Sequence, residues 1–247
     1  MKPMVLYFSP TGGTEKVARI ISDKLGIEAI DITVFDYHMK LESDQIVFFC
    51  FPVYGGRIPS IMYSRMENII GDKTPAVMVA VYGNRAVEDA LIEMSDLCTR
   101  KGFITVGGCE MIAPHSMDKR IAADRPNAGD AAALSDFVSK VIAKTENEVT
   151  AVKMPGNRMY RKYAGVGVRP SSSKKCEGCG TCAAECPTHA IDPGDPHKAD
   201  ENLCISCMRC VSMCPFEIRK LPLAAQLATS AFLLKACAGK KEPKFYI

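Results

Sequence analysis

The sequence predicts a doubly wound α/β domain with a parallel sheet, followed by a small cysteine-rich α+β domain. Strand-like and helix-like patterns alternate over about the first 145 residues, as expected when helices connect parallel strands. A turn rich in glycine and hydroxyl side chains, SPTGGT at 9–14, follows the first apolar run. Eight of the 12 cysteines fall between Cys176 and Cys214. These three observations locate both the fold and the candidate sites.

Five apolar runs are expected to form the sheet of the α/β domain. After its first residue, the third run, QIVFFCF, contains no polar alternation, which is typical of a strand covered by helices on both faces. The predicted strands, in chain order, are Met4–Phe8, Glu28–Thr33, Gln45–Phe51, Ala76–Tyr82 and Phe103–Ile112.

Helical periodicity fills the gaps between most of these runs. The first helix is expected to begin at Thr14, with Glu15 in its first turn and a buried stripe of apolar residues up to Leu25. The later helices are predicted at Pro59–Ile70, Ala86–Lys101 and Ala128–Lys144.

The chain is expected to divide into four regions: an α/β domain at 1–148, a basic linker at 149–175, the cysteine-rich domain at 176–218, and a helix and tail at 219–247. From Val152 to Lys175 the sequence has seven Lys and Arg residues and no acidic residue. Such a run is either a solvated connector or a segment that holds the domains together or steers an acidic partner.

Composition limits the classes of partner. No run reaches about 18 apolar residues, so no membrane span is expected, and Leu221–Leu234 is interpreted as a docking helix. The net charge of +3 is mild, and no basic stripe with interleaved aromatic residues is present, so no nucleic-acid partner is expected. With no signal-peptide pattern, a cytoplasmic protein is expected.

The SPTGGT turn has the composition of an anion site. Backbone N–H groups at a helix start favour a phosphate, and Gly12 and Gly13 let the backbone approach it. Ser9, Thr11 and Thr14 can donate hydroxyl hydrogen bonds. The turn lacks the lysine of a nucleoside-triphosphate loop and does not match G-x-G-x-x-G, so a single terminal phosphate fits it best. A polar turn with helix-capping threonines is the alternative.

Two further glycine-containing loops follow the third and fourth predicted strands. They read FPVYGGRIP and VYGNRA, and each contains a tyrosine, Tyr54 or Tyr82, that could flank a flat heteroaromatic ring. Gly55 and Gly56 leave the backbone free to approach the edge of such a ring. In doubly wound sheets, ligands bind beyond the carboxyl ends of the strands, where all these loops lie.

These loops resemble those of flavodoxins: SPTGGT is similar to the phosphate loop S-x-T-G-x-T, and the other two are similar to the flavin-ring loops. The resemblance covers about residues 1–145 and implies a five-stranded sheet of order 2-1-3-4-5 and bound FMN rather than FAD. The family commonly has asparagine at Gly13, and it can offer a backbone carbonyl, here within Tyr54–Gly56, to the reduced flavin. The implied FMN-binding residues are Ser9, Thr11, Gly12, Gly13, Thr14, Pro52, Val53, Tyr54, Gly55, Gly56, Tyr82, Gly83, Asn84 and Arg85.

The clustered cysteines form the pattern C-x2-C-x2-C-x3-C-P twice, with a period of 28 residues. This spacing resembles bacterial dicluster ferredoxins and implies two 4Fe-4S clusters, each taking its fourth ligand from the other repeat. The implied ligand sets are Cys176, Cys179, Cys182 and Cys214 for one cluster and Cys204, Cys207, Cys210 and Cys186 for the other. Zinc is the alternative metal. No role is assigned to Cys50, Cys98, Cys109 and Cys237, and His115 and His189 are expected to be structural or surface residues rather than ligands.

Together the sequence resembles a flavodoxin-like domain fused to a dicluster ferredoxin domain, an iron-sulfur flavoprotein arrangement found in anaerobic bacteria and archaea. The resemblance implies electron transfer between the clusters and FMN, as a carrier or one-to-two-electron converter. A ferredoxin or larger oxidoreductase would be its redox partner, and a homodimer is left open. No catalytic residue is predicted. The alternatives are an FMN-dependent oxidoreductase that reduces a quinone or nitro compound, with Arg57 or Arg85 orienting an anionic substrate, and a redox-sensing interaction protein.

Overall fold

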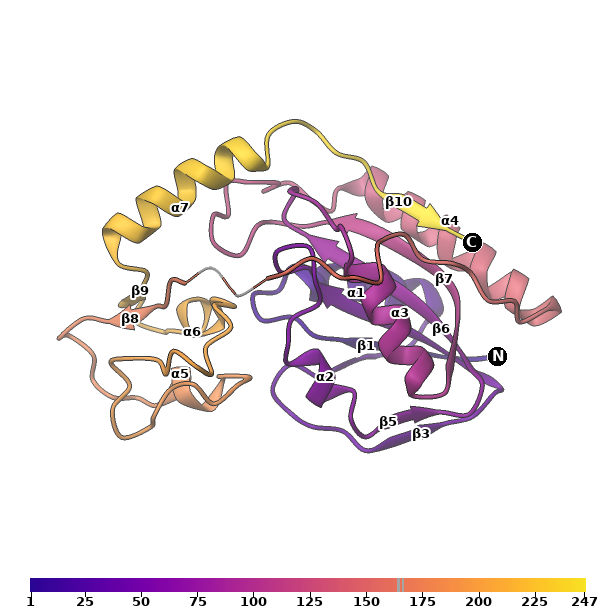
Figure 1. Ribbon diagram of the computed structural model, residues 1–247, viewed down its shortest axis with the longest axis horizontal. Helices are drawn as coiled ribbons and strands as arrows, with labels where there is room; N and C mark the ends of the chain where they lie inside the picture. The colour runs from indigo at the N-terminus through magenta and orange to yellow at the C-terminus, as the bar shows by residue number, and fades with distance from the viewer. Residues whose placement is uncertain (164, 166) are drawn as a thin grey trace.

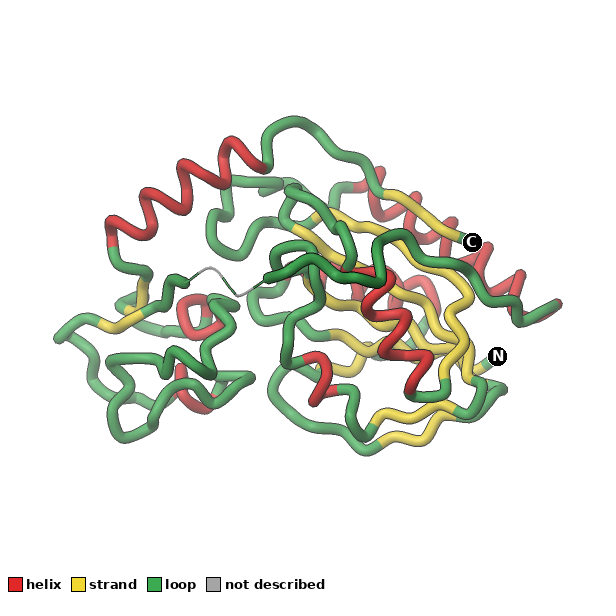
Figure 2. Tube along the Cα trace, viewed as in Figure 1, coloured by secondary structure: helices red, strands yellow, loops and turns green. Residues whose placement is uncertain are grey.

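The computed structural model describes residues 1–163, 165 and 167–247. Figure 1 shows an α/β domain that contains both chain ends and a smaller cysteine-rich domain beside it. Figure 2 shows that the cysteine-rich domain consists mostly of loops, whereas strands and helices dominate the α/β domain. Among the described residues, no helix combines the length and the apolar character needed to cross a bilayer.

The centre of the α/β domain is a six-stranded sheet with the order β10-β7-β6-β4-β1-β2. Five of its strands are parallel, and in the numbering of the predicted strands their order is 2-1-3-4-5, the flavodoxin-like doubly wound order. The sequence therefore predicted this topology correctly. The parallel strands are β1 (Lys2–Tyr7), β2 (Ala29–Asp31), β4 (Gln45–Pro52), β6 (Thr74–Tyr82) and β7 (Phe103–Ile112).

Helices cover both faces of this sheet. On one face, α1 (Gly13–Leu25) and α4 (Ala128–Asn147) pack on the strands through one apolar cluster. On the other face, α3 (Ala90–Arg100) packs through a second cluster and lies in front of the sheet in Figure 1. Every residue of β6 is buried, which explains why its sequence shows no polar alternation.

The helix predicted at Pro59–Ile70 is wrong. Only one turn, α2 (Met62–Arg65), is helical, and β5 (Ile69–Gly71) follows and pairs in parallel with β3 (Met39–Leu41). Ile69 is buried whereas Ile70 is 47% exposed, so burial alternates with the period of a strand. The two adjacent isoleucines hide this alternation in the sequence.

The residues before the cysteine-rich domain pack on the α/β domain. Val152 N–H donates to the Thr105 carbonyl at 2.8 Å, and the Met154 side chain is buried in the core. Further along, Arg158 forms an ion pair with Asp96 at 3.1 Å. This part of the predicted linker is therefore attached to α3 and β7, although most of its side chains remain exposed to solvent.

The end of the chain returns to the α/β domain. The predicted docking helix corresponds to α7 (Leu223–Ala236), which spans from the cysteine-rich domain toward the α/β domain in Figure 1. It is followed by β10 (Lys244–Tyr246), an antiparallel edge strand next to β7 that the sequence analysis did not predict.

The two cysteine repeats have the same backbone conformation. In the first repeat Gly178, Gly180 and His189 have φ values of 70°, 76° and 52°, and 28 residues later Ser206, Met208 and Glu217 have 53°, 66° and 54°. Each repeat therefore turns its chain in the left-handed region at equivalent points. The short helices α5 (Thr181–Ala184) and α6 (Arg209–Ser212) follow these turns, and β8 (Ser171–Ser172) pairs with β9 (Arg219–Lys220).

Candidate functional site

The SPTGGT turn connects β1 to α1 and leaves its backbone donors available. Gly12 precedes α1 with φ 84° and makes no side-chain cap on the helix. Ser9 Oγ accepts the Glu15 N–H at 2.9 Å, and the Ser9 N–H donates to Thr33 Oγ1 at 2.8 Å, which fixes the start of the turn. The first-turn N–H groups before Glu15 have no such side-chain acceptor. This arrangement suits an anion at the helix N-terminus.

The turn contributes to a small cavity where four loops meet. This cavity measures about 60 Å³ and is lined by the SPTGGT turn and by the loops that follow β4, β6 and β7. The loop after β7 was not part of the predicted site. It contributes Ala113, Pro114, His115 and Ser116.

A larger cavity of about 510 Å³ adjoins the small one, and the two share wall residues such as Val53, Tyr54 and Tyr82. Its volume lies in the range of small-molecule sites. Four separate parts of the chain form its walls: the loops of the α/β domain, Arg161 and Tyr163 of the predicted linker, the turn at Ile205–Ser206 in the cysteine-rich domain, and one side of α7. A ligand with a phosphate at one end and a flat ring at the other would match the two adjoining cavities, which are called the phosphate cavity and the ring cavity below.

Most of the predicted flavin residues line these cavities. They are Ser9, Thr11, Gly13, Thr14, Pro52, Val53, Tyr54, Gly55, Tyr82, Gly83 and Arg85.

The other three predicted residues have structural contacts instead. Gly12 supplies the positive φ of the turn, and Gly56 faces Glu88, whose Oε2 would lie 1.8 Å from an added Cβ. The Asn84 amide donates to the carbonyls of Cys237 and Gly239 at 2.6 and 2.8 Å. Asn84 therefore anchors the residues after α7, so its side chain is not directed at a ligand.

Tyr163 and His115 are wall residues that the sequence analysis did not assign to the site. An added Cβ on Gly55 would lie 2.3 Å from the Tyr163 ring, and one on Gly83 would lie 2.4 Å from the His115 ring. Burial lowers the pKa of His115, and its Nδ1 accepts the Met117 N–H at 3.2 Å, so the neutral ring has its proton on Nε2. Nothing in the neighbouring sequence predicts a role for either residue, because each ring is positioned by a glycine that is distant in the chain.

The eight clustered cysteines surround two cavities in the cysteine-rich domain. The cysteines around one cavity, called the first cysteine set, are Cys176, Cys179, Cys182 and Cys214. Those around the other cavity, called the second cysteine set, are Cys186, Cys204, Cys207 and Cys210. Each cavity thus takes three cysteines from one repeat and the fourth from the other. Among the described residues, no three His, Cys, Asp or Glu side chains converge on a site for a single metal ion.

Local polar groups differ between the cysteines. Burial raises the pKa of Cys207 to about 12, as expected for a thiol in an apolar pocket. Burial also acts to raise the pKa of Cys214, but backbone N–H groups of residues 216–219 outweigh it and hold that pKa below its usual value. Cys186 Sγ accepts the Ala190 N–H at 3.3 Å. Four sulfur atoms with N–H donors around them suit an iron–sulfur cluster.

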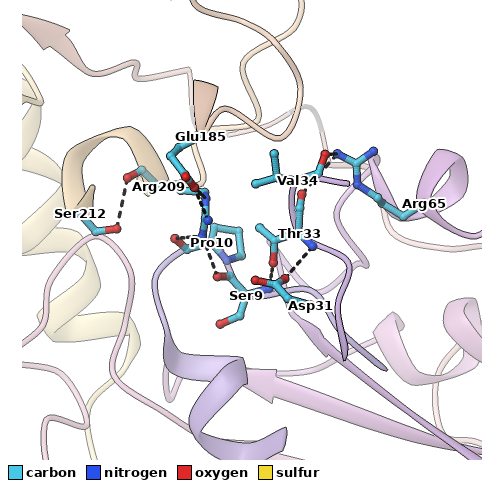
Figure 3. Close-up of polar contacts among 9 residues, drawn as sticks. All are labelled: Ser9, Pro10, Asp31, Thr33, Val34, Arg65, Glu185, Arg209 and Ser212. Atoms are coloured by element: carbon cyan, nitrogen blue, oxygen red, sulfur yellow. Dashed lines mark hydrogen bonds and ion pairs between the residues drawn. The ribbon is translucent and has the colours of Figure 1, made fainter. Parts of the chain in front are cut away.

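Two arginines connect residues next to the second cysteine set to the α/β domain. Figure 3 shows both arginines, with Arg209 close to Glu185 and to Ser9 and Pro10 of the phosphate turn. Arg65 of α2 is only 4% exposed and donates to the carbonyl of Pro187, the residue after Cys186, at 2.8 Å. Arg209, the residue before Cys210, pairs with Glu185 and lies 3.4 Å from the Ser9 carbonyl. The phosphate turn and α2 therefore contact residues that adjoin two cysteines of one set.

The second set also lies next to the ring cavity. Ile205 and Ser206, which line that cavity, form the turn between Cys204 and Cys207. Burial raises the pKa of Tyr54 well above its usual value, and the nearby Cys207 adds to this effect. The second cysteine set therefore shares wall residues with the ring cavity, whereas the cavity of the first set shares none.

Known proteins resemble both parts of the chain. Residues 175–218 match the family described as 4Fe-4S dicluster domain. Ferredoxin-2 of Chlorobaculum tepidum is 38% identical over 50 residues, which cover 17% of this chain and 81% of the ferredoxin.

Among solved structures, an archaeal flavodoxin is 13% identical and aligns with 60% of this chain and all of its own, at a TM-score of 0.45. A short-chain flavodoxin associated with a bacterial microcompartment is 15% identical, aligns with 58% of this chain and 99% of its own, and has a TM-score of 0.38. The strand order, rather than these distant likenesses, identifies the fold of the α/β domain. Through residues 175–218 the chain belongs to the dicluster 4Fe-4S ferredoxin family, and it joins that domain to a flavodoxin-like domain.

Proposed function

We propose that this protein transfers electrons between two 4Fe-4S clusters and one FMN inside a single chain, as a carrier or one-to-two-electron converter for a protein redox partner. A ferredoxin domain next to a flavodoxin-like fold supports electron transfer. The observation that carries the proposal is the position of Ile205 and Ser206, which belong to the Cys204–Cys207 turn and also line the ring cavity.

The cysteines would hold the clusters in the crossed arrangement. The lining of the two cavities supports this assignment, because each combines three cysteines of one repeat with the last cysteine of the other. When bound, the clusters supply one-electron chemistry and the flavin can accept one or two electrons. The first cysteine set includes the exposed Cys179, so an external partner would approach there.

The α/β domain would hold FMN across its two cavities. The N–H groups at the start of α1 and the hydroxyls of Thr11 and Thr14 would bind the phosphate. Tyr54 and Tyr82 would flank the ring, and Tyr163 would close the site beside Gly55. FMN rather than FAD is expected because the turn offers donors for one phosphate group and has no pyrophosphate motif.

The position of α7 favours a carrier over an enzyme that reduces small molecules. Ala228, Thr229, Phe232 and Leu233 of this helix form one wall of the ring cavity. Two contacts hold this helix in place. The Asn84 amide donates to the Cys237 carbonyl at its end, and Arg120, which forms an ion pair with Asp118, donates to Ser230 in its middle. A small acceptor would have to reach the flavin past this wall.

The cofactors and the electron donor can be tested together. Protein purified without oxygen is analysed for iron, sulfide and flavin, and the flavin released by heat is identified by chromatography. We expect FMN and two clusters, flavin reduction by a reduced low-potential ferredoxin, and none by NADH or NADPH. FAD or no flavin would refute the flavin assignment, and rapid multiple turnover of a quinone or nitro compound would instead support the enzyme.

Replacing Gly55 with alanine is expected to weaken flavin binding about tenfold. The new Cβ would collide with the Tyr163 ring, and a non-glycine residue at φ 58° adds about 1–2 kcal/mol of strain. The matched control is Gly26→Ala at the end of α1, where φ is 67° but nothing lies within 4 Å of the added Cβ. Flavin fluorescence titration of both variants checks this. Equal flavin affinity in the two variants would mean that Tyr163 does not close the site.

A further inference from the structure

Arg219 is a fully buried arginine beside the first cysteine set. Among the described residues it is the largest fully buried side chain, and it is only 1% exposed. It lies on β9, whose pairing with β8 holds its backbone, and β9 lies against α6. Its side chain lines the cavity of the first cysteine set together with Cys182 and Cys214.

The polar contacts of Arg219 leave its charge uncompensated. The guanidinium donates to the carbonyls of Pro196 and Pro170, the second at 3.2 Å, and its Nε is buried without an acceptor. Within the described part of the chain, no carboxylate forms an ion pair with it. The other deeply buried arginines differ, because Arg65 pairs with Asp36 and Arg125 pairs with Asp130.

A buried guanidinium without a counter-charge is strongly unfavourable, and arginine stays protonated at any ordinary pH. The missing negative charge must therefore come from something that the two cysteine sets hold. Arg219 lines the cavity of the first set beside Cys182 and Cys214, and its strand β9 contacts α6, the helix that contains Cys210 of the second set. Arg219 is thus close to cysteines of both sets.

We propose that Arg219 is the internal counter-charge of both clusters and that it raises their reduction potentials. A 4Fe-4S cluster with four thiolates has a charge of about −2, and one electron from the reductant makes it about −3. A fixed positive charge favours the more negative state. With an effective dielectric constant of about 20, a unit charge several ångströms away shifts such an equilibrium by at least about tenfold. This inference rests on the cluster part of the proposed function and not on the flavin.

The test compares three variants of the holoprotein. Arg219→Gln removes the charge, Arg219→Lys keeps it, and Lys220→Gln removes the same charge from the exposed neighbouring residue. Iron and sulfide are counted, and the midpoint potential of each cluster is measured by redox titration followed by electron paramagnetic resonance. For Arg219→Gln we expect the cluster signals to shift to lower potential by at least the equivalent of a tenfold change, about 59 mV for one electron. For Lys220→Gln and Arg219→Lys we expect much smaller shifts, because solvent screens the exposed charge and lysine retains the buried one.

Each outcome decides the proposal. Unchanged potentials in an Arg219→Gln variant that holds both clusters would overturn it. If Arg219→Gln loses its clusters but Arg219→Lys retains them, the need for the charge is supported. If both variants lose them, the shape and hydrogen bonds of the guanidinium matter instead, and the proposal is wrong. If the cluster potentials shift as expected but the clusters never reduce a flavin, the proposed electron route is refuted and this inference remains intact.

Discussion

Replacing Cys186 with serine is expected to remove the cluster of the second cysteine set, although Cys186 belongs to the first repeat. Its sulfur lines the same cavity as Cys204, Cys207 and Cys210. A cluster that loses one thiolate ligand is expected to be lost or badly damaged, which removes about half of the iron. Because this cluster adjoins the ring cavity, flavin reduction by a protein donor should also stop.

The reciprocal variant is Cys182→Ser, which should remove the other cluster. Iron analysis and electron paramagnetic resonance of the two variants show which signal each one loses. The expected result is that each variant retains the signal that the other lacks. Loss of the same signal in both variants would contradict the crossed arrangement, and unaltered iron in Cys186→Ser would exclude Cys186 as a ligand.

Replacing Gly12 with valine is expected to abolish flavin binding while leaving the iron content unchanged. Gly12 has φ 84°, a conformation that a β-branched residue adopts only with strain, so the turn would rearrange. The N–H groups at the start of α1 would then lose the position in which they can bind a phosphate.

The matched control for this variant is Gly26→Val, at the other end of the same helix. Gly26 has φ 67°, and nothing lies within 4 Å of an added Cβ there. Both variants should lose similar stability in thermal unfolding, but only Gly12→Val should lose its flavin, as absorbance and chromatography of the released flavin would show. If Gly12→Val binds flavin as the parent does, the SPTGGT turn is not the phosphate site.

Features set by local pattern were predictable from the sequence. The three central parallel strands β4, β6 and β7 are apolar runs buried on both faces, and Phe103–Ile112 has the predicted bounds. The cysteine spacing resembles that of dicluster ferredoxins, which implies two crossed sets, and each of the two cavities is lined by one of these sets. The local signal is the apolar run of each strand and the repeated cysteine spacing, whereas the exchange of the fourth ligand between repeats comes from the family resemblance.

Features set by contacts between distant segments were not predictable. β10 contains only three residues and becomes a strand because β7 leaves an edge open beside it. Asn84 looks like a ligand residue in its loop, but its amide binds carbonyls more than 150 positions later. The walls formed by α7 and Tyr163 depend in the same way on how the end of the chain and the linker pack. The burial of Arg219 could not be predicted, since its neighbours Ile218 and Lys220 form no pattern that distinguishes it from a surface arginine.

The central claim is that electrons pass from the clusters to the flavin within one molecule. The most direct measurement is anaerobic stopped-flow mixing of the holoprotein with a limiting amount of reduced low-potential ferredoxin, over a dilution series, with cluster and flavin absorbance recorded together. The account predicts that cluster reduction comes first, and that the flavin is then reduced with a rate constant that does not change on dilution. A flavin reduction rate that falls in proportion to protein concentration, or flavin reduction while the clusters stay oxidised, would contradict it.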